Sequence, residues 1–373
     1  MIFVAGIYVH IPFCKSKCPY CDFYSFCKGE NYKKEYVSSL IDEIKTNRRL
    51  NTYLDKSNFT SDTIYIGGGT PSVLSGEALY NIITAIKEGF NVTKNAEITV
   101  ECNPNSVIEA LIPYFKACGV NRISLGMQSA VDDERKKLGR TANKQRIFDI
   151  INVLKTSGVT NISLDIMLGI PNQTLESLKE TLDFIRLCEV KHVSAYILNL
   201  EENTPFFKMK EKLNLPNEDE VCELYEYTCK YLKNIGFNHY EISNFAIPGF
   251  ESKHNNKYWL LEDYVGLGPA AHSFINGKRY YFKSDIESFI AGEPPLFDCD
   301  GGDSSEYIML RLRLKEGLKL SDLEKKYGAT TLDSIRLKAI QLKKQDLIEF
   351  DGDRLALTEK GYLLSNSIIN EFI

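Results

Sequence analysis

No stretch of the sequence holds eighteen or more consecutive apolar residues, so the sequence predicts no transmembrane helix. The segment before the first cysteine is apolar but has no basic region and no small-residue cleavage site, which predicts a strand instead of a secretion signal. The sequence also lacks an excess of positive charge, because its 50 Asp and Glu outnumber its 45 Lys and Arg and give a net charge of −5. Nucleic-acid binding needs a basic surface, so this balance argues against it.

Cysteine, by contrast, is abundant, with ten residues in the chain. Without a secretion signal, these cysteines predict a cytoplasmic protein, with a peripheral position at the membrane as a further option. In that reducing compartment, clustered cysteines more often bind metal or take part in chemistry than form disulfides. Three cysteines between positions 14 and 21 are closely spaced, and Cys27 lies six residues beyond them. We expect the others to be ordinary core or surface residues.

Short apolar runs alternate with helical patterns from Gly6 to about Leu198. The runs are rich in Val, Ile and Tyr, as strands are, and the segments between them repeat apolar residues at helical spacing. The expected strands are Ile7–Ile11, Thr63–Ile66, Glu97–Val100, Arg122–Leu125, Asn161–Met167 and His192–Leu198. Strands joined by helical crossovers form a parallel sheet, so these units predict an α/β protein with a partial (β/α)6 barrel.

The remainder of the chain follows a different pattern. Residues 237–303 are irregular and aromatic, whereas residues 304–373 predict helices, a short hairpin and a closing helix. That order is winged-helix-like and typical of a small α+β domain. We therefore predict three parts, which are a barrel with its following helices over 1–236, an aromatic linker over 237–303, and a C-terminal domain over 304–373. Winged helices often bind DNA, but the acidic chain argues against that function here.

Polar residues and glycines stand at the ends of the predicted strands. The first strand ends in the cysteine loop, the second in Gly67-Gly-Gly-Thr-Pro71, and the next three at or near Glu101, Gln128 and Asp165. Reactive groups of α/β barrels lie at the carboxyl ends of the strands. A purely structural core does not require this pattern, so we expect the functional face there.

The closely spaced cysteines allow three interpretations. Their spacing could align them on one face of a helix, but Pro12 and Pro19 disfavour a helix because the residue before a proline avoids helical geometry. A structural zinc site needs four ligands, and the sequence does not identify a clear fourth, although Cys27 could serve in principle. An iron–sulfur cluster usually takes four thiolates, so three would leave one iron open to another ligand.

The pattern Cys14-x3-Cys18-x2-Cys21 after a first strand resembles the motif of the radical S-adenosylmethionine (SAM) superfamily, and the resemblance covers residues 6–200. It implies a [4Fe–4S] cluster on these three cysteines, SAM bound at the open iron, and a reductant that supplies one electron. SAM cleavage would give methionine and a 5′-deoxyadenosyl radical, and that chemistry belongs to the cofactors. We assign no separate catalytic residue.

The resemblance also implies the residues that bind SAM. A glycine loop lets backbone approach the ligand, Arg140 suits the SAM carboxylate, and the other side chains match those that hold or contact SAM in the family. The set comprises Tyr8, Gly67, Gly68, Gly69, Thr70, Glu101, Gln128, Arg140 and Asp165. Taken alone, the glycine loop fits a tight turn equally well, and Glu101, Gln128 and Asp165 fit polar strand ends with local hydrogen bonds. Arg140 taken alone is more typical of a surface arginine.

Within the superfamily, the chain resembles the group formed by the oxygen-independent coproporphyrinogen III dehydrogenases and the haem chaperones, HemN and HemW. The segments that carry this likeness are Tyr8–Cys14, Cys18–Phe23, Gly67–Pro71, Glu101–Pro104, Gly126–Ser129 and Leu164–Pro171. The dehydrogenases have a further cysteine two residues after the third cluster ligand, where this chain has Phe23. The likeness therefore favours the chaperone branch.

A second segment favours the same branch. His254-Asn-Asn-Lys-Tyr258-Trp259 resembles the His-Asn-x-x-Tyr-Trp haem-binding motif of the chaperones. It implies that His254 ligates haem iron and that Tyr258 and Trp259 pack on the macrocycle. Without the resemblance, the same residues fit a structural loop, and His272 is an alternative ligand.

We therefore expect a radical SAM protein that binds haem and passes it to acceptor haemoproteins, with the membrane as one place of transfer. The alternative is a dehydrogenase that decarboxylates the propionates of coproporphyrinogen III, which the sequence disfavours. A third hypothesis is a radical SAM enzyme for an unrelated substrate. Enzyme activity as such is left open.

Overall fold

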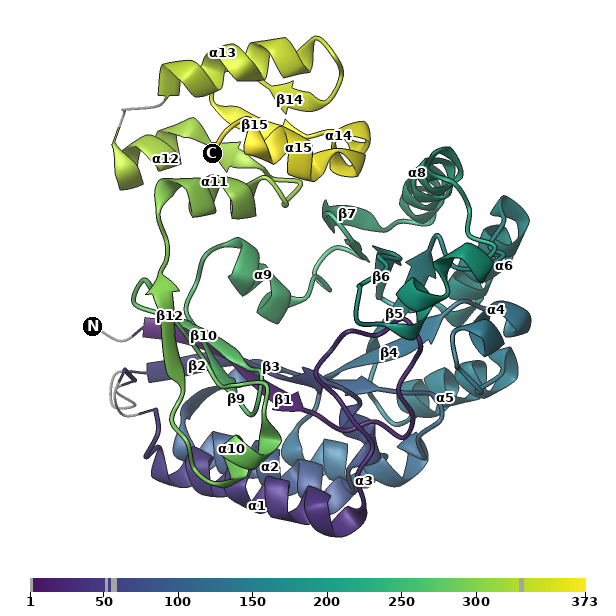
Figure 1. The fold of residues 1–373 in the computed structure, drawn as a ribbon, viewed down its shortest axis with the longest axis vertical. Helices are drawn as coiled ribbons and strands as arrows, with labels where there is room; N and C mark the ends of the chain where they lie inside the picture. The colour runs from purple at the N-terminus through teal and green to yellow at the C-terminus, as the bar shows by residue number, and fades with distance from the viewer. Residues whose placement is uncertain (1–2, 51–52, 55–58, 329–331) are drawn as a thin grey trace.

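One large sheet organises most of the chain. The computed structural model describes residues 3–50, 53–54, 59–328 and 332–373 (Figure 1). Within these residues, twelve strands form a single sheet in the order β12-β11-β10-β9-β1-β2-β3-β4-β5-β6-β8-β7. The first six strands in the sequence lie together at its centre, which makes them the framework for everything else.

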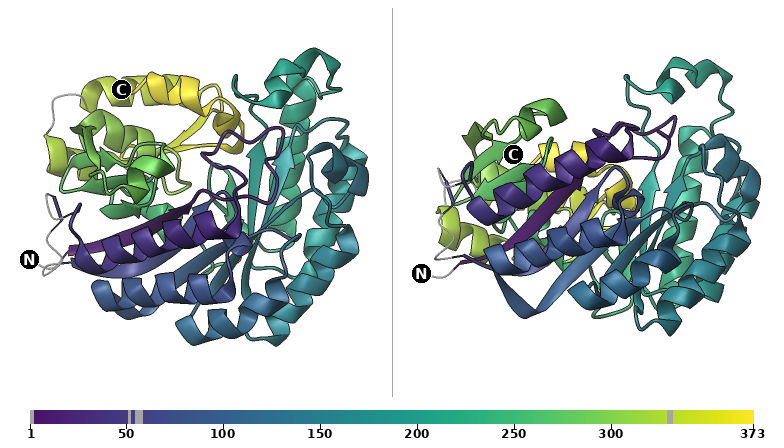
Figure 2. Two further views of the ribbon diagram at one scale, coloured as in Figure 1. Left: turned by 60° about the horizontal axis from the view of Figure 1, so that its bottom comes forward. Right: turned by 90° about the horizontal axis from the view of Figure 1, so that it is seen from below.

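These six central strands are parallel to one another, as βαβ crossovers require. They are β1 (Phe3–Ile11), β2 (Phe59–Gly68), β3 (Asn91–Cys102), β4 (Arg122–Gln128), β5 (Asn161–Leu168) and β6 (His192–Ile197). The helices between them are α1 (Glu30–Thr46), η2 (Pro71–Val73), α2 (Gly76–Gly89), α3 (Ile108–Cys118), α4 (Asp132–Lys137), α5 (Lys144–Thr156) and α6 (Leu175–Cys188). Figure 2 shows these helices along the outer face of the curved sheet. The predicted α/β partial barrel is therefore confirmed.

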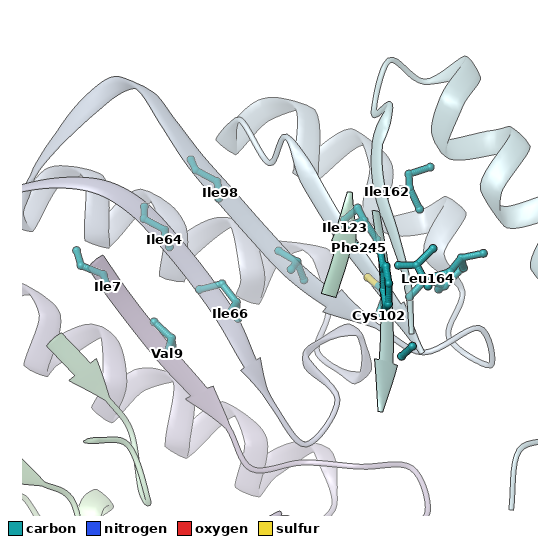
Figure 3. Close-up of a cluster of buried hydrophobic side chains, with 14 of the residues drawn as sticks. Ile7, Val9, Ile64, Ile66, Ile98, Cys102, Ile123, Ile162, Leu164 and Phe245 are labelled. Atoms are coloured by element: carbon teal, nitrogen blue, oxygen red, sulfur yellow. The ribbon is translucent and has the colours of Figure 1, made fainter. Parts of the chain in front are cut away.

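The main core lies between the sheet and its outer helices. Alternate residues of each strand point toward the helices, so Ile7 and Val9 of β1 lie beside Ile64 and Ile66 of β2 (Figure 3). All four side chains are fully buried. Burying each one stabilises the fold by about 1.5–3 kcal/mol. The remaining side chains of each strand point into the barrel interior, where polar residues can be accommodated.

The segment predicted to be an aromatic linker instead extends the sheet at both edges. On one side β9 pairs in parallel with β1, and β10 to β12 follow as antiparallel strands. On the other side β8 and β7 pair antiparallel to β6 and to each other. The elements are β7 (Asn238–Glu241), β8 (Asn244–Ala246), α9 (Lys253–Trp259), β9 (Tyr264–Leu267), β10 (His272–Ile275), β11 (Lys278–Tyr281), α10 (Ile286–Ile290) and β12 (Leu296–Asp300). Strands of three to five residues are too short for a clear alternating pattern, which explains why the sequence did not indicate them.

The C-terminal residues form the predicted winged-helix-like unit above the sheet (Figure 1). It contains α11 (Ser304–Arg311), β13 (Leu318–Lys319), α12 (Leu320–Tyr327), α13 (Leu332–Lys343), β14 (Ile348–Phe350), β15 (Arg354–Leu357), α14 (Glu359–Leu363) and α15 (Ser365–Asn370). Before it, α7 (Pro205–Lys208), η3 (Lys210–Lys212) and α8 (Glu218–Asn234) follow the barrel. The predicted hairpin is present as β14 and β15. No helix among the described residues combines the length and the apolar character needed to cross a membrane.

We predict that Ile66→Ala lowers the free energy of unfolding by about 2–5 kcal/mol, because it leaves a cavity between the central sheet and the helices. Urea unfolding followed by circular dichroism measures the change. Leu337→Ala is the control, since its side chain on α13 is 66% exposed and should change stability by no more than about 0.5 kcal/mol. Equal losses in the two variants would contradict the placement of the core.

Candidate iron–sulfur centre and SAM cavity

The cysteine loop leaves the end of β1 and returns beside it. The backbone N–H of Cys14 donates to Phe26 O at 3.0 Å, and the N–H of Phe26 donates to Pro12 O at 3.0 Å. Phe13, between them, is fully buried against Phe26 and Tyr36. These contacts close the base of the loop, so the cysteines lie on a fixed turn and not on the helix that their spacing also allowed.

The glycine loop after β2 lies directly against this turn. Gly69 N–H donates to Ile11 O and Thr70 N–H donates to Phe13 O, both at 2.8 Å. As a result Cys14 Sγ lies 3.4 Å from Thr70 Oγ1. A Cβ on Gly69 would come within 2.8 Å of Phe13 O, so the close approach requires glycine.

The three predicted ligands, Cys14, Cys18 and Cys21, line one cavity of about 570 Å³. All three are half-buried free thiols. Burial raises the pKa of Cys21, and the neighbouring cysteines add to that rise. Cys27 lies elsewhere, since it is exposed and its thiol donates to Lys15 O at 3.4 Å. The structure thus separates Cys27 from the three others.

The donor set fits a cubane cluster better than a single zinc ion. Three soft thiolates suit an iron–sulfur cluster. Each would bind a different iron, so the sulfurs need not converge on one point. Among the described residues, no three His, Cys, Asp or Glu side chains are grouped to hold one metal ion. When bound, such a cluster supplies the electron that cleaves SAM.

Most of the predicted SAM residues line the same cavity. Those that do are Gly68, Gly69, Thr70, Glu101, Gln128, Arg140 and Asp165. Tyr8 and Gly67 do not line it. The Tyr8 hydroxyl instead lies 3.0 Å from His10 Nδ1, and a Cβ on Gly67 would come within 3.0 Å of Glu101 Oε1. Gly67 thus lies against the cavity residue Glu101, whereas the hydroxyl of Tyr8 contacts His10, which does not line the cavity.

Two half-buried carboxylates line the cavity, and each already accepts hydrogen bonds. Glu101 accepts from the Tyr65 hydroxyl at 2.7 Å and from Gly68 N–H at 3.1 Å. Burial raises its pKa to about 7. Asp165 accepts from Ser124 Oγ at 3.0 Å, and burial raises its pKa as well. Both carboxylates can accept hydrogen bonds from a cationic or hydroxylated ligand when ionised.

Arg140 and Gln128 line the side of the cavity that is nearer the three cysteines. Arg140 donates to the Tyr20 hydroxyl at 2.9 Å from its Nη2, and its guanidinium reaches the cavity. Gln128 ends β4 with φ of 71°, a left-handed conformation that is strained for a non-glycine residue. Strained backbone of this kind often marks a functional position. A register shift in the β4–β5 pairing accompanies it.

The floor of the cavity contains residues that the sequence analysis did not select. Arg122 is 2% exposed and its Nε is among the buried polar atoms without a hydrogen-bond partner in the described part of the chain. Its charge acts to lower the pKa values of Glu101 and Asp165. Tyr65, Ser124, Ser194, Tyr196 and Asn255 also line the cavity. In β4, every second side chain points into the barrel, and Arg122 is one of them. This alternation was the signal that could have identified Arg122 from the sequence.

The predicted haem motif forms α9, which lies between the large sheet and the C-terminal unit and packs against β1, β2 and α11 (Figure 1). His254 is 1% exposed, and its Nδ1 and Nε2 lie 2.8 Å from Thr63 Oγ1 and 2.9 Å from Tyr258 Oη. Its ring stacks on Tyr65 at 5.2 Å. Burial lowers its pKa to about 3, so the ring is neutral. Both ring nitrogens are hydrogen-bonded in this conformation, so ligation of iron by His254 stays a prediction and would require at least one of these bonds to break.

The rest of the motif divides between two surroundings. Asn255 lines the SAM cavity, whereas Tyr258 contacts Tyr264 edge-on. Trp259 lies under the Arg313 guanidinium at 5.3 Å, at the contact with the C-terminal unit. The sequence motif thus marks a structural junction between the cavity floor and that unit.

Three cysteines in the loop after β1, a glycine loop beside them and an adjoining polar cavity define a radical SAM protein. Residues 8–185 match the model of the radical SAM superfamily, and residues 304–364 match the HemN C-terminal domain. "Heme chaperone HemW" of Lactococcus lactis is 35% identical over 98% of this chain and 96% of its own length, and that of Bacillus subtilis is 33% identical over 98% of each. The chain therefore belongs to the HemW family of the radical SAM superfamily. Coproporphyrinogen III oxidase (HemN) from Escherichia coli shares the fold, with a TM-score of 0.85 at 21% identity over 100% of this chain and 90% of that one.

We predict that anaerobic reconstitution loads about four irons and four sulfides per chain, as one cubane requires. Replacement of Cys14, Cys18 or Cys21 by Ser should abolish the visible absorption of the cluster. Cys27→Ser is the matched control and should retain it, because Cys27 lies outside the cavity. Equal dependence on Cys27 would contradict a three-thiolate cluster.

We also predict that SAM binding strengthens as pH rises through about 7, the pKa of Glu101. A raised pKa leaves the carboxyl protonated below that point, so affinity at pH 6 should be about tenfold weaker than at pH 8. SAM titration of the reduced cluster, followed by electron paramagnetic resonance, measures this. Arg122→Gln should move the midpoint to higher pH, because a cation that lowers the pKa is lost.

Glu101→Gln provides the control for this pH profile. It removes the titrating group, so binding should be weaker and should no longer change between pH 6 and pH 8. A profile that persists in Glu101→Gln would assign the pH dependence to another group.

Proposed function

We propose that the chain is a haem chaperone, which binds haem and transfers it to acceptor haemoproteins. The observation that carries this proposal is similarity along almost the whole chain to proteins named heme chaperone, including that of Escherichia coli at 32% identity over 99% of this chain. The likeness includes the segments outside the barrel. Of those segments, β7 to β12 extend the barrel sheet at its two edges, whereas β13 to β15 form a separate three-stranded sheet.

We assign the cofactors within this proposal as follows. Cys14, Cys18 and Cys21 hold the [4Fe–4S] cluster. The cavity residues Gly68, Gly69, Thr70, Glu101, Gln128, Arg140 and Asp165 hold SAM, whereas Tyr8 and Gly67 do not line the cavity. This assignment is supported because the three cysteines and the seven cavity residues line the same cavity, and because that cavity offers groups that can hydrogen-bond to SAM. A reductant of the cell supplies the cluster with its electron.

For haem, the motif in α9 is one candidate site. Tyr258 and Trp259 offer aromatic surface. For His254 to reach iron, however, α9 would have to leave its place, where Glu97 accepts hydrogen bonds from the backbone N–H groups of Lys253 and His254. A haem site in α9 therefore needs a conformational change that opens the floor of the SAM cavity.

The dehydrogenase hypothesis is not proposed. Its support is the shared fold with HemN at 21% identity, which speaks for architecture alone. Phe23 occupies the position at which the sequence comparison expects a further cysteine, and its side chain is 68% exposed at the cavity. We place the chaperone in the cytoplasm, with acceptors reached there or at the membrane surface, and without a nucleic-acid partner.

We predict that the cluster-loaded protein binds one haem per chain and donates it to apomyoglobin faster than a haem–albumin control does. It should not convert coproporphyrinogen III to protoporphyrinogen IX in the presence of SAM and a reductant. Absorption spectroscopy measures the transfer and chromatography of porphyrins measures the conversion. Steady formation of protoporphyrinogen IX without specific haem binding would reverse the assignment.

A further inference from the structure

The accessible histidine of this protein lies on β10 and not in α9. The chain contains five histidines. The rings of His10 and His192, like that of His254, have both nitrogens within 3.0 Å of a hydroxyl or carbonyl oxygen, and each residue is at most 6% exposed. These rings have no nitrogen to offer to a ligand.

The fourth histidine, His239, is also enclosed. Its ring stacks on Phe245 at 4.2 Å and contacts Tyr362 at 4.8 Å, while its Nδ1 is buried. His272 differs from all four, because it is exposed and has no hydrogen bond from its ring to any described residue. Iron in haem is commonly held by an imidazole nitrogen.

His272 belongs to a row of three side chains across the outer strands. Tyr281 of β11 pairs with His272, and Leu296 of β12 pairs with Tyr281, so the three side chains share one face. The His272 and Tyr281 rings stack at 5.6 Å with 22° between their planes, and Leu296 is 37% exposed. We call these three residues the shelf. It offers aromatic and aliphatic surface beside a free imidazole.

The shelf lies at the same end of the sheet as the cysteine loop. Because β9 runs parallel to β1 and β10 turns back from it, His272 stands near the carboxyl ends of the strands. Beyond β11 the chain meets the cysteine loop directly, where Ile286 N–H donates to the Tyr24 hydroxyl at 2.9 Å. A planar ligand on the shelf would therefore lie beside that loop.

Charged neighbours of the shelf suit a metal-bound imidazole and an acidic porphyrin. Asp298, two residues after Leu296 on the same face, is close enough for its charge to act on His272. A carboxylate near a ligating histidine commonly orients the ring and increases its basicity. Lys283 follows Tyr281 by two residues, and its ion pair with Glu293 is solvent-exposed, so its ammonium can exchange partners for a propionate.

We propose that His272 is the axial ligand of haem iron and that haem lies on the shelf formed with Tyr281 and Leu296. This inference rests on the proposed function, since it names the ligand of the haem that the chaperone carries. An open shelf with a single protein ligand leaves one face of the macrocycle accessible, which suits a protein that must release its haem.

The test uses the full chain with its cluster, titrated with haemin and recorded as difference spectra against the cluster-loaded protein. His272→Ala should lose the Soret shift of a histidine-ligated haem, and added imidazole should restore it. Asp298→Asn should retain ligation with about tenfold weaker affinity. His239→Gln is the matched control and should match the unsubstituted chain. Circular dichroism and cluster content confirm that each variant is folded.

His254→Gln distinguishes the shelf from α9. The shelf predicts an unchanged Soret band in this variant, whereas loss in His254→Gln with retention in His272→Ala would overturn the inference in favour of α9. Retention in both variants would also overturn it, because the ligand would then not be either histidine. If both variants lose the band, restoration of His272→Ala by imidazole supports the shelf and failure of restoration refutes it. Absence of specific haem binding by the unsubstituted chain would instead refute the proposed function.

Discussion

Two backbone hydrogen bonds join the ends of β1 and β2 beyond their regular pairing, from Gly69 N–H to Ile11 O and from Thr70 N–H to Phe13 O. They place the cysteine loop on the glycine loop before any cofactor is considered. The cluster ligands and the backbone that would meet SAM are therefore positioned by the same two strands. Since both strands are anchored by fully buried isoleucines, the site inherits the rigidity of the core.

The interior of the barrel has the opposite character to its outer face. Instead of aliphatic side chains, the inward positions carry Glu101, Asp165 and Arg122, together with serines and tyrosines. Buried charges are costly unless they are paired or matched by a ligand. Serine and tyrosine hydroxyls meet part of that requirement for the carboxylates. The unpaired Nε of Arg122 indicates that this interior is arranged for more than its own stability.

Much of the fold follows from local patterns in the sequence. The six central strands and their helices are long enough for periodicity to show, and the hairpin of the C-terminal unit carries a clear turn, in which Gly352 adopts φ of 109°. The edge strands β7 to β12 could not be found in this way, because they are short and form through pairing with β1 and β6, which are distant in the sequence. Pairing of that kind leaves no periodic signal.

The same distinction holds for the site. Residues attached to strand ends were identified because topology brings those ends together. Arg122 and Tyr65 were not, since they lie within strands and their inward direction depends on register. His254 shows the limit of motif arguments, because a sequence match cannot indicate that both ring nitrogens are already hydrogen-bonded. Whether a histidine is accessible is decided by tertiary packing.

The parallel pairing of β9 with β1 has a consequence for how the chain acquires its structure during synthesis. The first strand leaves the ribosome early, but its outer neighbour is made more than two hundred residues later. Until then β1 presents an unpaired edge, the kind of surface that promotes association between chains. The nascent barrel must therefore remain incomplete until nearly three quarters of the chain has been translated, and a fragment that ends before β9 would retain this adhesive edge.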